Sequence, residues 1–471
     1  MSSGLPPRID RLPAGEIHAV GAAGLETAAM VRYLVEGGRP GIVLHDAAAD
    51  VDSAFAAAHR LQPADQRARA RAALARCRDL RSGPDYLAGV ESAVAVLAPV
   101  AWFLHPANER LGALRDRFVT YPDACFDLWR GPVIGVTGSY GKTTTTRFAA
   151  ALTEGACCGN DRESYFDLGA LAAEPPGRPM AFEASNRHLH NGFRRVLDIG
   201  VLTGIALNHE PDHGSFAAYR QVKYSLAARC RDLLYHAAIP ATYPDAAVLA
   251  AGGTAYGPGG AWQLTGATVA GPGARRYPLP GVTGLAAPDR DNALAAVAAA
   301  ASCGVAPEEV ARRSLSLAAV RPRYRHAVAE GAGRTVVNDA ASCMPASTAA
   351  LVAGLDRPFV LICGGDRQLY RPGEFGQLAR TVAGNPHAVR VCVLGPMAGH
   401  IRAALGSVGF AATDWCAGLD QAVERALATP AEVVVFSPGC GTGSDFADKY
   451  ARGEAFDRAV ARLVPAGQTA P

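Results

Sequence analysis

The sequence predicts an α/β protein built from three domains in series. At 471 residues, with 49% hydrophobic and 19% charged residues, the chain is too long for a single hydrophobic core, so we expect two to four domains. Short apolar strands alternate with helical segments along the chain, a pattern typical of parallel sheets. One strand, within residues 134–146, runs into a glycine turn and a hydroxyl-rich helix.

The first domain begins with a strand, a glycine turn, a helix and a second strand, all within residues 16–46. The second strand ends in Asp46, and the unit resembles half of a dinucleotide-binding domain, although the turn at 21–24 lacks the full glycine fingerprint. Simple packing of helix on strand explains that turn equally well. Another apolar strand follows at 93–97. We therefore predict a Rossmann-like domain over residues 1–130.

The second domain opens on a stretch, 134–146, with the chemistry of a phosphate-binding loop. Its glycines let main-chain N–H groups turn toward anionic oxygens, and the helix N-terminus adds partial positive charge. Lys142 places an ammonium at the terminal phosphates, and Thr143 can reach Mg²⁺. The general pattern G-x-x-x-x-G-K-[ST] is missed by one residue, because Val136 stands where its first glycine should be. The loop predicts a nucleoside triphosphate and leaves open a kinase, an ATPase or a ligase.

Polar side chains follow the next buried strands of this domain. Glu183 ends one apolar strand, and His213 comes after a strand predicted at 201–207. Carboxyl ends of parallel strands share one edge of a sheet, so a carboxylate and an imidazole beside a triphosphate predict a Mg²⁺ site. The next helix carries Lys223, a position where an exposed, solvated lysine is the commonest interpretation.

The α/β pattern resumes after a helix at 292–300 and a linker at 320–325. We therefore place a central P-loop domain at 131–320 and a C-terminal Rossmann-like domain at 321–471. The strands predicted in the third domain are 335–339, 359–365, 389–395 and 433–438.

Composition argues against several classes of protein. A net charge of +3 is small for this length, so nothing supports a nucleic-acid partner beyond the arginines at 67–71, which we interpret as a solvated helix face. The eleven cysteines show neither C-x-x-C pairs nor zinc spacing, which indicates reduced thiols. No apolar run approaches the roughly 18 residues of a membrane span, and no signal segment is visible. We expect a cytoplasmic monomer that does not bind a membrane.

The order of these motifs resembles the Mur ligase family over almost the whole chain, most nearly its D-glutamate-adding member. The family's T-G-x-x-G-K-[ST] loop matches residues 137–143, which also explains the missing first glycine. Further matches, in order along the chain, are Gly159-Asn160, Glu183-Ala184-Ser185, Asp212-His213, Tyr219 with Lys223, Asn292, Asn338-Asp339, Gly364-Gly365-Asp366-Arg367 and the segment from Ser437-Pro438 to Arg452-Gly453.

The resemblance implies three domains, for a UDP-linked acceptor, for ATP and for an amino acid, and it implies roles for individual residues. The catalytic residues would be Lys142, Glu183, His213 and Lys223. The metal ligands would be Thr143, Glu183, His213 and Lys223, with Lys223 carbamylated so that its anion holds a second Mg²⁺. ATP would contact Thr137, Gly138, Ser139, Tyr140, Gly141, Lys142, Thr143, Thr144, Asn292, Asp339 and a linker arginine, Arg323 or Arg325. The substrates would contact Asn160, Ser185, Arg367, Thr442 and Phe446.

The chain also departs from the family pattern. Pro288-Asp289 replaces a His-Asn pair, and Ala341 stands where D-glutamate-adding members carry a lysine that pairs with a substrate carboxylate. Because an unpaired buried carboxylate costs several kcal/mol, D-glutamate would need another cation, such as Arg367 or Lys449. The N-terminal domain also lacks a clear uridine signature.

The resemblance implies that an acceptor carboxylate attacks the γ-phosphate of ATP, and that an amine then displaces phosphate from the acyl phosphate. Three hypotheses follow. The first is a cell-wall ligase that adds glutamate to a UDP-muramoyl-alanine acceptor, and the second is the same chemistry with different substrates in specialised metabolism. The third is a non-catalytic nucleotide-binding protein, against which the intact Lys142, Glu183, His213 and Lys223 argue.

Overall fold

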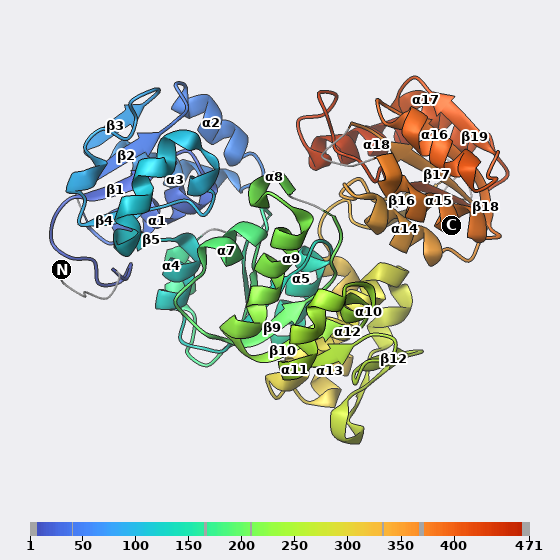
Figure 1. Ribbon diagram of the computed structural model, residues 1–471, viewed down its shortest axis with the longest axis horizontal. Coiled ribbons are helices and arrows are strands. Elements are labelled where there is room, and N and C mark those ends of the chain that lie inside the picture. The colour runs from blue at the N-terminus through green and yellow to red at the C-terminus, as the bar shows by residue number, and fades with distance from the viewer. Residues whose placement is uncertain are drawn as a thin grey trace.

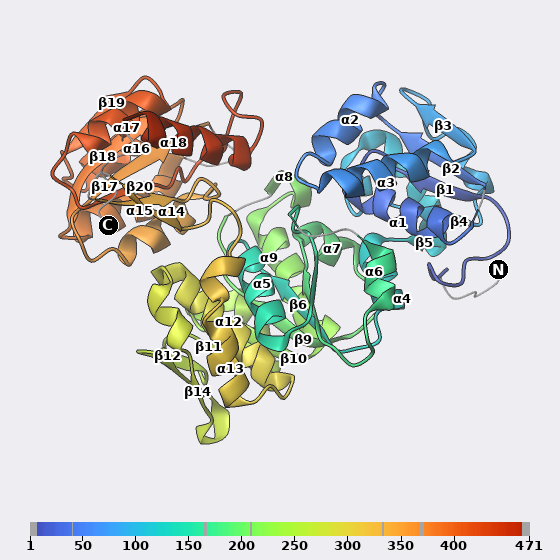
Figure 2. The ribbon, with the colours of Figure 1, turned by 180° about the vertical axis from the view of Figure 1, so that it is seen from behind.

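Three sheets with helices packed on them form three lobes along the chain (Figure 1). The computed structural model describes residues 7–39, 41–163, 167–207, 210–331, 334–366 and 372–463. The central lobe lies below the other two, and the same arrangement is seen from behind (Figure 2). The predicted α/β class with three such units is confirmed.

The N-terminal lobe is a parallel five-stranded sheet of order β3-β2-β1-β4-β5. Its strands β1, β2 and β4 are buried along their whole length, as their apolar runs predicted, whereas the edge strand β3 is mostly exposed. The elements are β1 (Ile17–Val20), α1 (Leu25–Glu36), β2 (Ile42–Asp46), α2 (Val51–Ala58), α3 (Ala64–Ala75), β3 (Asp79–Ser82), β4 (Ala95–Leu97), β5 (Phe118–Val119) and α4 (Tyr121–Leu128).

The central lobe has a parallel six-stranded sheet of order β11-β10-β9-β6-β8-β7 and a small antiparallel sheet of three strands. The strands are β6 (Val133–Thr137), β7 (Ala156–Gly159), β8 (Met180–Glu183), β9 (Leu197–Leu202), β10 (Cys230–His236), β11 (Gly253–Tyr256), β12 (Gln263–Thr265), β13 (Thr268–Ala270) and β14 (Arg276–Pro278). The helices are α5 (Lys142–Thr153), α6 (Leu168–Ala173), α7 (Asn186–Asn191), α8 (Glu210–His213), α9 (Phe216–Tyr224), α10 (Ala238–Thr242), α11 (Ala247–Gly252), α12 (Ala287–Ser302) and α13 (Pro307–Ser314).

The strand predicted at 201–207 is wrong beyond Leu202, where β9 ends. The chain turns away there because its polar groups bind the phosphate loop instead of a neighbouring strand. Thr203 Oγ1 donates to the carbonyl of Thr137 at 3.1 Å, and the N–H of Ser139 donates to the carbonyl of Gly204 at 2.6 Å.

Helix α12 packs against α5 through alanines that are completely buried between residues 293 and 300. Small side chains let the two helices approach closely. This packing carries Asn292, near the start of α12, against Gly141 of the loop, and its Oδ1 accepts a hydrogen bond from Thr145 Oγ1 at 3.2 Å.

The C-terminal lobe is a six-stranded sheet of order β15-β16-β20-β17-β18-β19, parallel except for the edge strand β15. Two apolar clusters fill its two faces. Its elements are β15 (Ala327–Gly331), β16 (Arg334–Asn338), α14 (Pro345–Ala353), β17 (Phe359–Gly364), α15 (Phe375–Gly384), β18 (Ala388–Leu394), α16 (Ala398–Ser407), β19 (Thr413–Cys416), α17 (Leu419–Leu427), β20 (Val433–Phe436) and α18 (Lys449–Leu463).

All eleven cysteines are free thiols. Among the described residues, no helix combines the length and the apolar character needed to cross a bilayer.

Candidate active site

The phosphate loop connects β6 to α5 in a shape that requires its glycines. Gly138 and Gly141 have φ values of +151° and +81°, which L side chains rarely adopt. A Cβ atom on Gly138 would lie 2.1 Å from Thr203 Oγ1, and one on Gly141 would lie 2.5 Å from Asn292 Oδ1. Helix α5 begins directly after the loop at Lys142, so its free N–H groups face the cavity.

Lys142 is half-buried at the start of α5 and donates from Nζ to the carbonyl of Ser139 at 3.3 Å. Burial lowers the pKa of Lys142, and the nearby carboxylate of Glu183 opposes that shift. The ammonium has no ion pair among the described residues, so it is available to an anionic ligand of the loop.

Glu183 is 1% exposed at the end of β8, next to β6. Its Oε1 accepts a hydrogen bond from Asn160 Nδ2 at 3.2 Å. Its Oε2 is buried and has no hydrogen-bond partner in the described part of the chain. A buried carboxylate oxygen without a partner is costly, so this atom is suited to bind a cation.

Lys223 lies beneath the loop and is also 1% exposed, contrary to the interpretation of an exposed lysine. Its Nζ donates to Thr137 Oγ1 at 2.9 Å, and that hydroxyl donates to the carbonyl of Ala184 at 2.6 Å. Burial holds the pKa of Lys223 well below its usual value; the positive charge of Lys142 adds to the shift, and Glu183 opposes it. Burial therefore makes the neutral amine of Lys223 easier to form than that of an exposed lysine.

His213 lies at the end of α8, and no hydrogen bond or ion pair joins it to Glu183 in the described chain. Its Nε2 accepts from Asn186 Nδ2 at 2.9 Å. Burial lowers the pKa of His213, and the charge of His190 adds to the shift. Ser185 serves as the N-cap of α7, where its hydroxyl accepts from the N–H of His188 at 3.2 Å.

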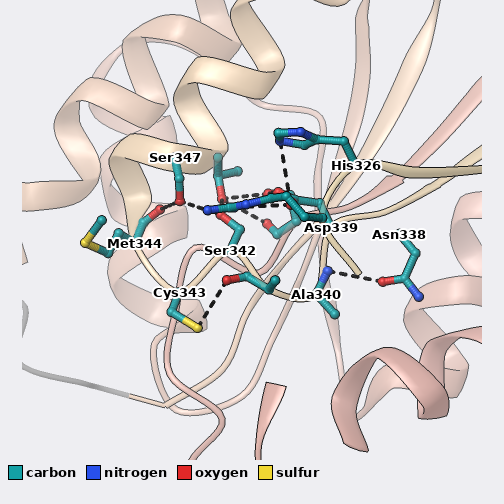
Figure 3. Close-up of polar contacts among 12 residues, drawn as sticks. His326, Asn338, Asp339, Ala340, Ser342, Cys343, Met344 and Ser347 are labelled. Atoms are coloured by element: carbon teal, nitrogen blue, oxygen red, sulfur yellow. Dashed lines mark hydrogen bonds and ion pairs between the residues drawn. The ribbon is translucent and has the colours of Figure 1, made fainter. Parts of the chain in front are cut away.

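On the C-terminal lobe, Asp339 is fully buried just after β16 (Figure 3). It accepts from Ser437 Oγ at 2.7 Å and from the Arg325 guanidinium at 3.3 Å. His326 lies beside it, with Nε2 3.7 Å from Asp339 Oδ1, and its Nδ1 is 2.9 Å from the carboxylate of Asp289. This cluster joins α12 of the central lobe to the first strands of the C-terminal lobe.

The two linker arginines, between which the sequence did not decide, differ in position. Arg325 lines a cavity together with the phosphate loop. Arg323 is half-exposed, with its Nε 3.8 Å from Glu163 and its guanidinium 5.4 Å from the centre of the Tyr450 ring. The geometry therefore favours Arg325 at the site.

The cavity has a volume of about 440 Å³ and lies between the loop and the C-terminal lobe. From the predicted set it brings together Ser139, Tyr140, Gly141, Lys142, Thr143, Thr144, Asn160, Glu183 and Thr442. The cavity is also lined by Asp161, Arg162, Cys343 and Tyr450, to which the sequence assigned no role. Asn292 lines a smaller adjoining cavity with Tyr140, His236 and Tyr256.

Other predicted residues lie elsewhere. Thr137 and Lys223 support the loop from below, and Gly138 shapes it. Phe446 packs partly buried against the apolar cluster of its own lobe. Arg367 lies outside the described residues.

Comparisons with known proteins agree with this geometry, although no family model matches the chain. It is 31% identical over 373 residues to UDP-N-acetylmuramoylalanine--D-glutamate ligase of Roseiflexus sp. (strain RS-1), covering 71% of this chain and 77% of that protein. It is 29% identical over 358 residues to the protein of the same name in Pelotomaculum thermopropionicum, covering 71% and 76%.

Solved structures share the fold at lower identity. The ligase MurC of Thermotoga maritima matches with a TM-score of 0.57 at 17% identity, over 94% of this chain and 98% of its own. MurF of Acinetobacter baumannii matches with a TM-score of 0.59 at 15% identity, over 96% and 92%. The chain thus belongs to the Mur ligase family of ATP-dependent, ADP-forming amide ligases.

Proposed function

We propose that the protein joins D-glutamate to UDP-N-acetylmuramoyl-L-alanine in peptidoglycan synthesis. The observation that carries the proposal is the cavity itself, where a phosphate loop, a buried carboxylate and the wall of a separate lobe meet. The names of the sequence relatives supply the substrates. Residues 1–130 would hold the acceptor, residues 131–320 would hold ATP, and residues 321–471 would hold the amino acid.

In the first step the acceptor carboxylate attacks the γ-phosphorus of ATP, and the bond to the β–γ bridging oxygen breaks to release ADP. The loop N–H groups and the Lys142 ammonium neutralise charge that spreads over the transferring oxygens. Arg325 would approach the same phosphates from the C-terminal side. Tyr140 borders both cavities, so the adjoining one is suited to the nucleoside of ATP.

Magnesium fits the residues present. The unpartnered Oε2 of Glu183 and the hydroxyl of Thr143 face the cavity, and Mg²⁺ commonly binds through one carboxylate together with substrate phosphates and water. Held by these two residues, the ion would offset the negative charge of the phosphates. His213 is held by Asn186 on the side of α7, so a role as ligand would need it to turn.

Burial of Lys223 favours carbamylation, because it lowers the pKa of the ammonium and a neutral amine is the nucleophile toward CO₂. Its nitrogen lone pair would form a bond to the carbon of CO₂, one C=O electron pair would move to oxygen, and the N–H proton would leave to solvent. The resulting anion would sit between Thr137 and Glu183, where Mg²⁺ would compensate the added charge.

In the second step the amine of the amino acid attacks the acyl carbon, and phosphate leaves. Water must be kept from the intermediate, and contacts between the outer lobes and the loop region provide closure. Arg60 of the N-terminal lobe forms an ion pair with Asp448 of the C-terminal lobe, and Gln62 Nε2 donates to the carbonyl of Arg162 at 2.7 Å.

The test is ADP release from ATP with UDP-N-acetylmuramoyl-L-alanine and a panel of amino acids, with Lys142→Ala as the control. We expect release that needs both the acceptor and D-glutamate and that falls at least about 100-fold in the control. Release that depends on another acceptor or amino acid would favour a ligase of specialised metabolism, a possibility that Ala341 in the cavity wall keeps open. No release with any amine would refute a catalytic function.

A further inference from the structure

The C-terminal wall of the cavity carries an unusual cation, Lys449, the first residue of α18. Around it the wall is small or apolar at Ala341 and Cys343 and includes the hydroxyl-bearing residues Thr442 and Tyr450. Lys449 is therefore a positive charge above short side chains, and Arg325, the other cation of this wall, is bonded to Asp339.

Several other charged residues of the cavity have partners, whereas Arg162 is an exposed cation on the central lobe. Arg325 is bonded to Asp339, and Asp448 is paired with Arg60. Lys142 points toward the loop carbonyl of Ser139. In the described part of the chain, no carboxylate pairs with Lys449.

The contact recorded for the Lys449 ammonium is with the ring of Tyr450, whose centre is 5.0 Å from Nζ. Its charge is close enough to Lys142 to lower the pKa of that residue. Two ammonium groups therefore approach one cavity from opposite lobes, and a ligand must supply negative charge to both.

Lys449 is held in place by its neighbours. Asp448 accepts hydrogen bonds from the N–H groups of Tyr450 and Ala451 at 2.8 and 2.9 Å, which fixes the first turn of α18. Tyr450 is 4% exposed and anchors that turn against the central lobe beside Glu163. The position of the Lys449 backbone is thus defined, and the ammonium can reach into the cavity.

We infer that Lys449 binds the side-chain carboxylate of the incoming amino acid and makes the enzyme selective for a dicarboxylic substrate. The inference rests on the proposed function. The α-carboxylate of that substrate is attached to the carbon that bears the reacting amine, so it stays near the phosphates and Lys142. The side-chain carboxylate extends away from the loop, toward Lys449, while its methylenes pass over Ala341 and Cys343.

The experiment compares D-glutamate with D-glutamine, which has the same shape but no side-chain charge. Steady-state rates are measured at saturating ATP and acceptor for the wild type, Lys449→Met and Lys449→Arg. The matched control is Arg458→Met, which removes an exposed cation from the same helix outside the cavity. For Lys449→Met we expect kcat/KM for D-glutamate to fall about 10- to 100-fold. The kcat/KM for D-glutamine and the KM for ATP should stay nearly unchanged.

Lys449→Arg should recover part of the D-glutamate rate, and Arg458→Met should leave both rates unchanged. An equal loss for both amino acids, or a rise confined to the KM for ATP, would overturn the inference while leaving the proposed function intact. A wild-type enzyme that releases ADP with neither amino acid would overturn both. Calorimetric binding of D-glutamate in the presence of a non-hydrolysable ATP analogue provides a readout without turnover, and an unchanged affinity in Lys449→Met would also overturn the inference.

Discussion

Replacement of Gly141 by alanine should damage the nucleotide site through the shape of the loop alone. The new methyl group carries no charge, so any effect on ATP comes from the backbone and from Asn292, which the Cβ would meet at 2.5 Å. Gly304 is a matched control, because it has the same φ of +81° after α12 and a Cβ there would meet nothing within 4 Å.

The two variants share one energetic cost and differ in another. Each places an L-residue in the left-handed region, at about 1–2 kcal/mol. Gly141→Ala must also displace the Asn292 amide, which accepts from Thr145, and the loss of that hydrogen bond adds about 1 kcal/mol. If the loop relaxes to avoid these two costs, ATP binding must restore its shape. The two costs together are about 2–3 kcal/mol, which corresponds to a rise of roughly 30- to 150-fold in the KM for ATP.

The assay combines thermal unfolding with the dependence of ADP release on ATP concentration. Gly304→Ala should lower the thermal midpoint by a few degrees and leave the KM for ATP unchanged, whereas Gly141→Ala should lower the midpoint further and raise that KM. Equal midpoints in the two variants, together with an unchanged KM, would refute the argument that Asn292 and the left-handed glycine shape the loop.

Three further variants test charge and burial. Glu183→Gln should lower kcat at least about 100-fold and raise the Mg²⁺ concentration needed for half activity; an unchanged Mg²⁺ requirement would contradict the metal site. Lys223→Met should abolish activity. At any pH below 10.5 it should also raise the midpoint of thermal unfolding, because the native lysine binds its proton less readily than the unfolded chain does. A lower midpoint would contradict that reasoning. His59, stacked on Phe55, has a pKa lowered by burial to about 4, so the native state loses stability as pH falls from 6.5 to 4. His59→Gln should remove about 3 kcal/mol of that loss, measured by urea unfolding at pH 7.5 and 4.5, and identical acid sensitivity in both proteins would exclude it.

The sequence predicted the α/β class and most strands of the three sheets because buried parallel strands are continuous apolar runs. Edge strands such as β3 (Asp79–Ser82) and β19 (Thr413–Cys416) were missed. The residues of β3 are mostly exposed and polar, and β19 is a short strand in which only Cys416 is buried. The error at 203–207 has the opposite cause. Those residues follow a buried strand and are partly apolar, so the sequence pattern extends the strand through them. The strand ends at Leu202 because the next residues form hydrogen bonds with the phosphate loop instead.

Within the candidate site, local motifs predicted the loop residues, and tertiary pairing decided the rest. Arg323 and Arg325 are two residues apart and chemically identical, yet only Arg325 lines the cavity. Asp339, which directly follows β16, holds the guanidinium of Arg325 there. Lys449 lies within the 437–453 segment, and the sequence named it only as one of two cations that could replace the lysine absent at Ala341. The structure places it in the cavity wall, with no carboxylate partner in the described chain, which no spacing along the chain reveals.

The misplaced glycine of the loop has a structural reason. Val136 is completely buried in β6, opposite Glu183 of β8 and Val201 of β9. A strand residue at this point extends β6 by one position and brings Thr137 to the end of the sheet, where its hydroxyl accepts the hydrogen bond from Lys223. A glycine at 136 would forfeit that buried packing and loosen the strand that positions Thr137. The departure from the general pattern thus gives the buried Lys223 its hydrogen-bond partner at the end of β6, beneath the loop.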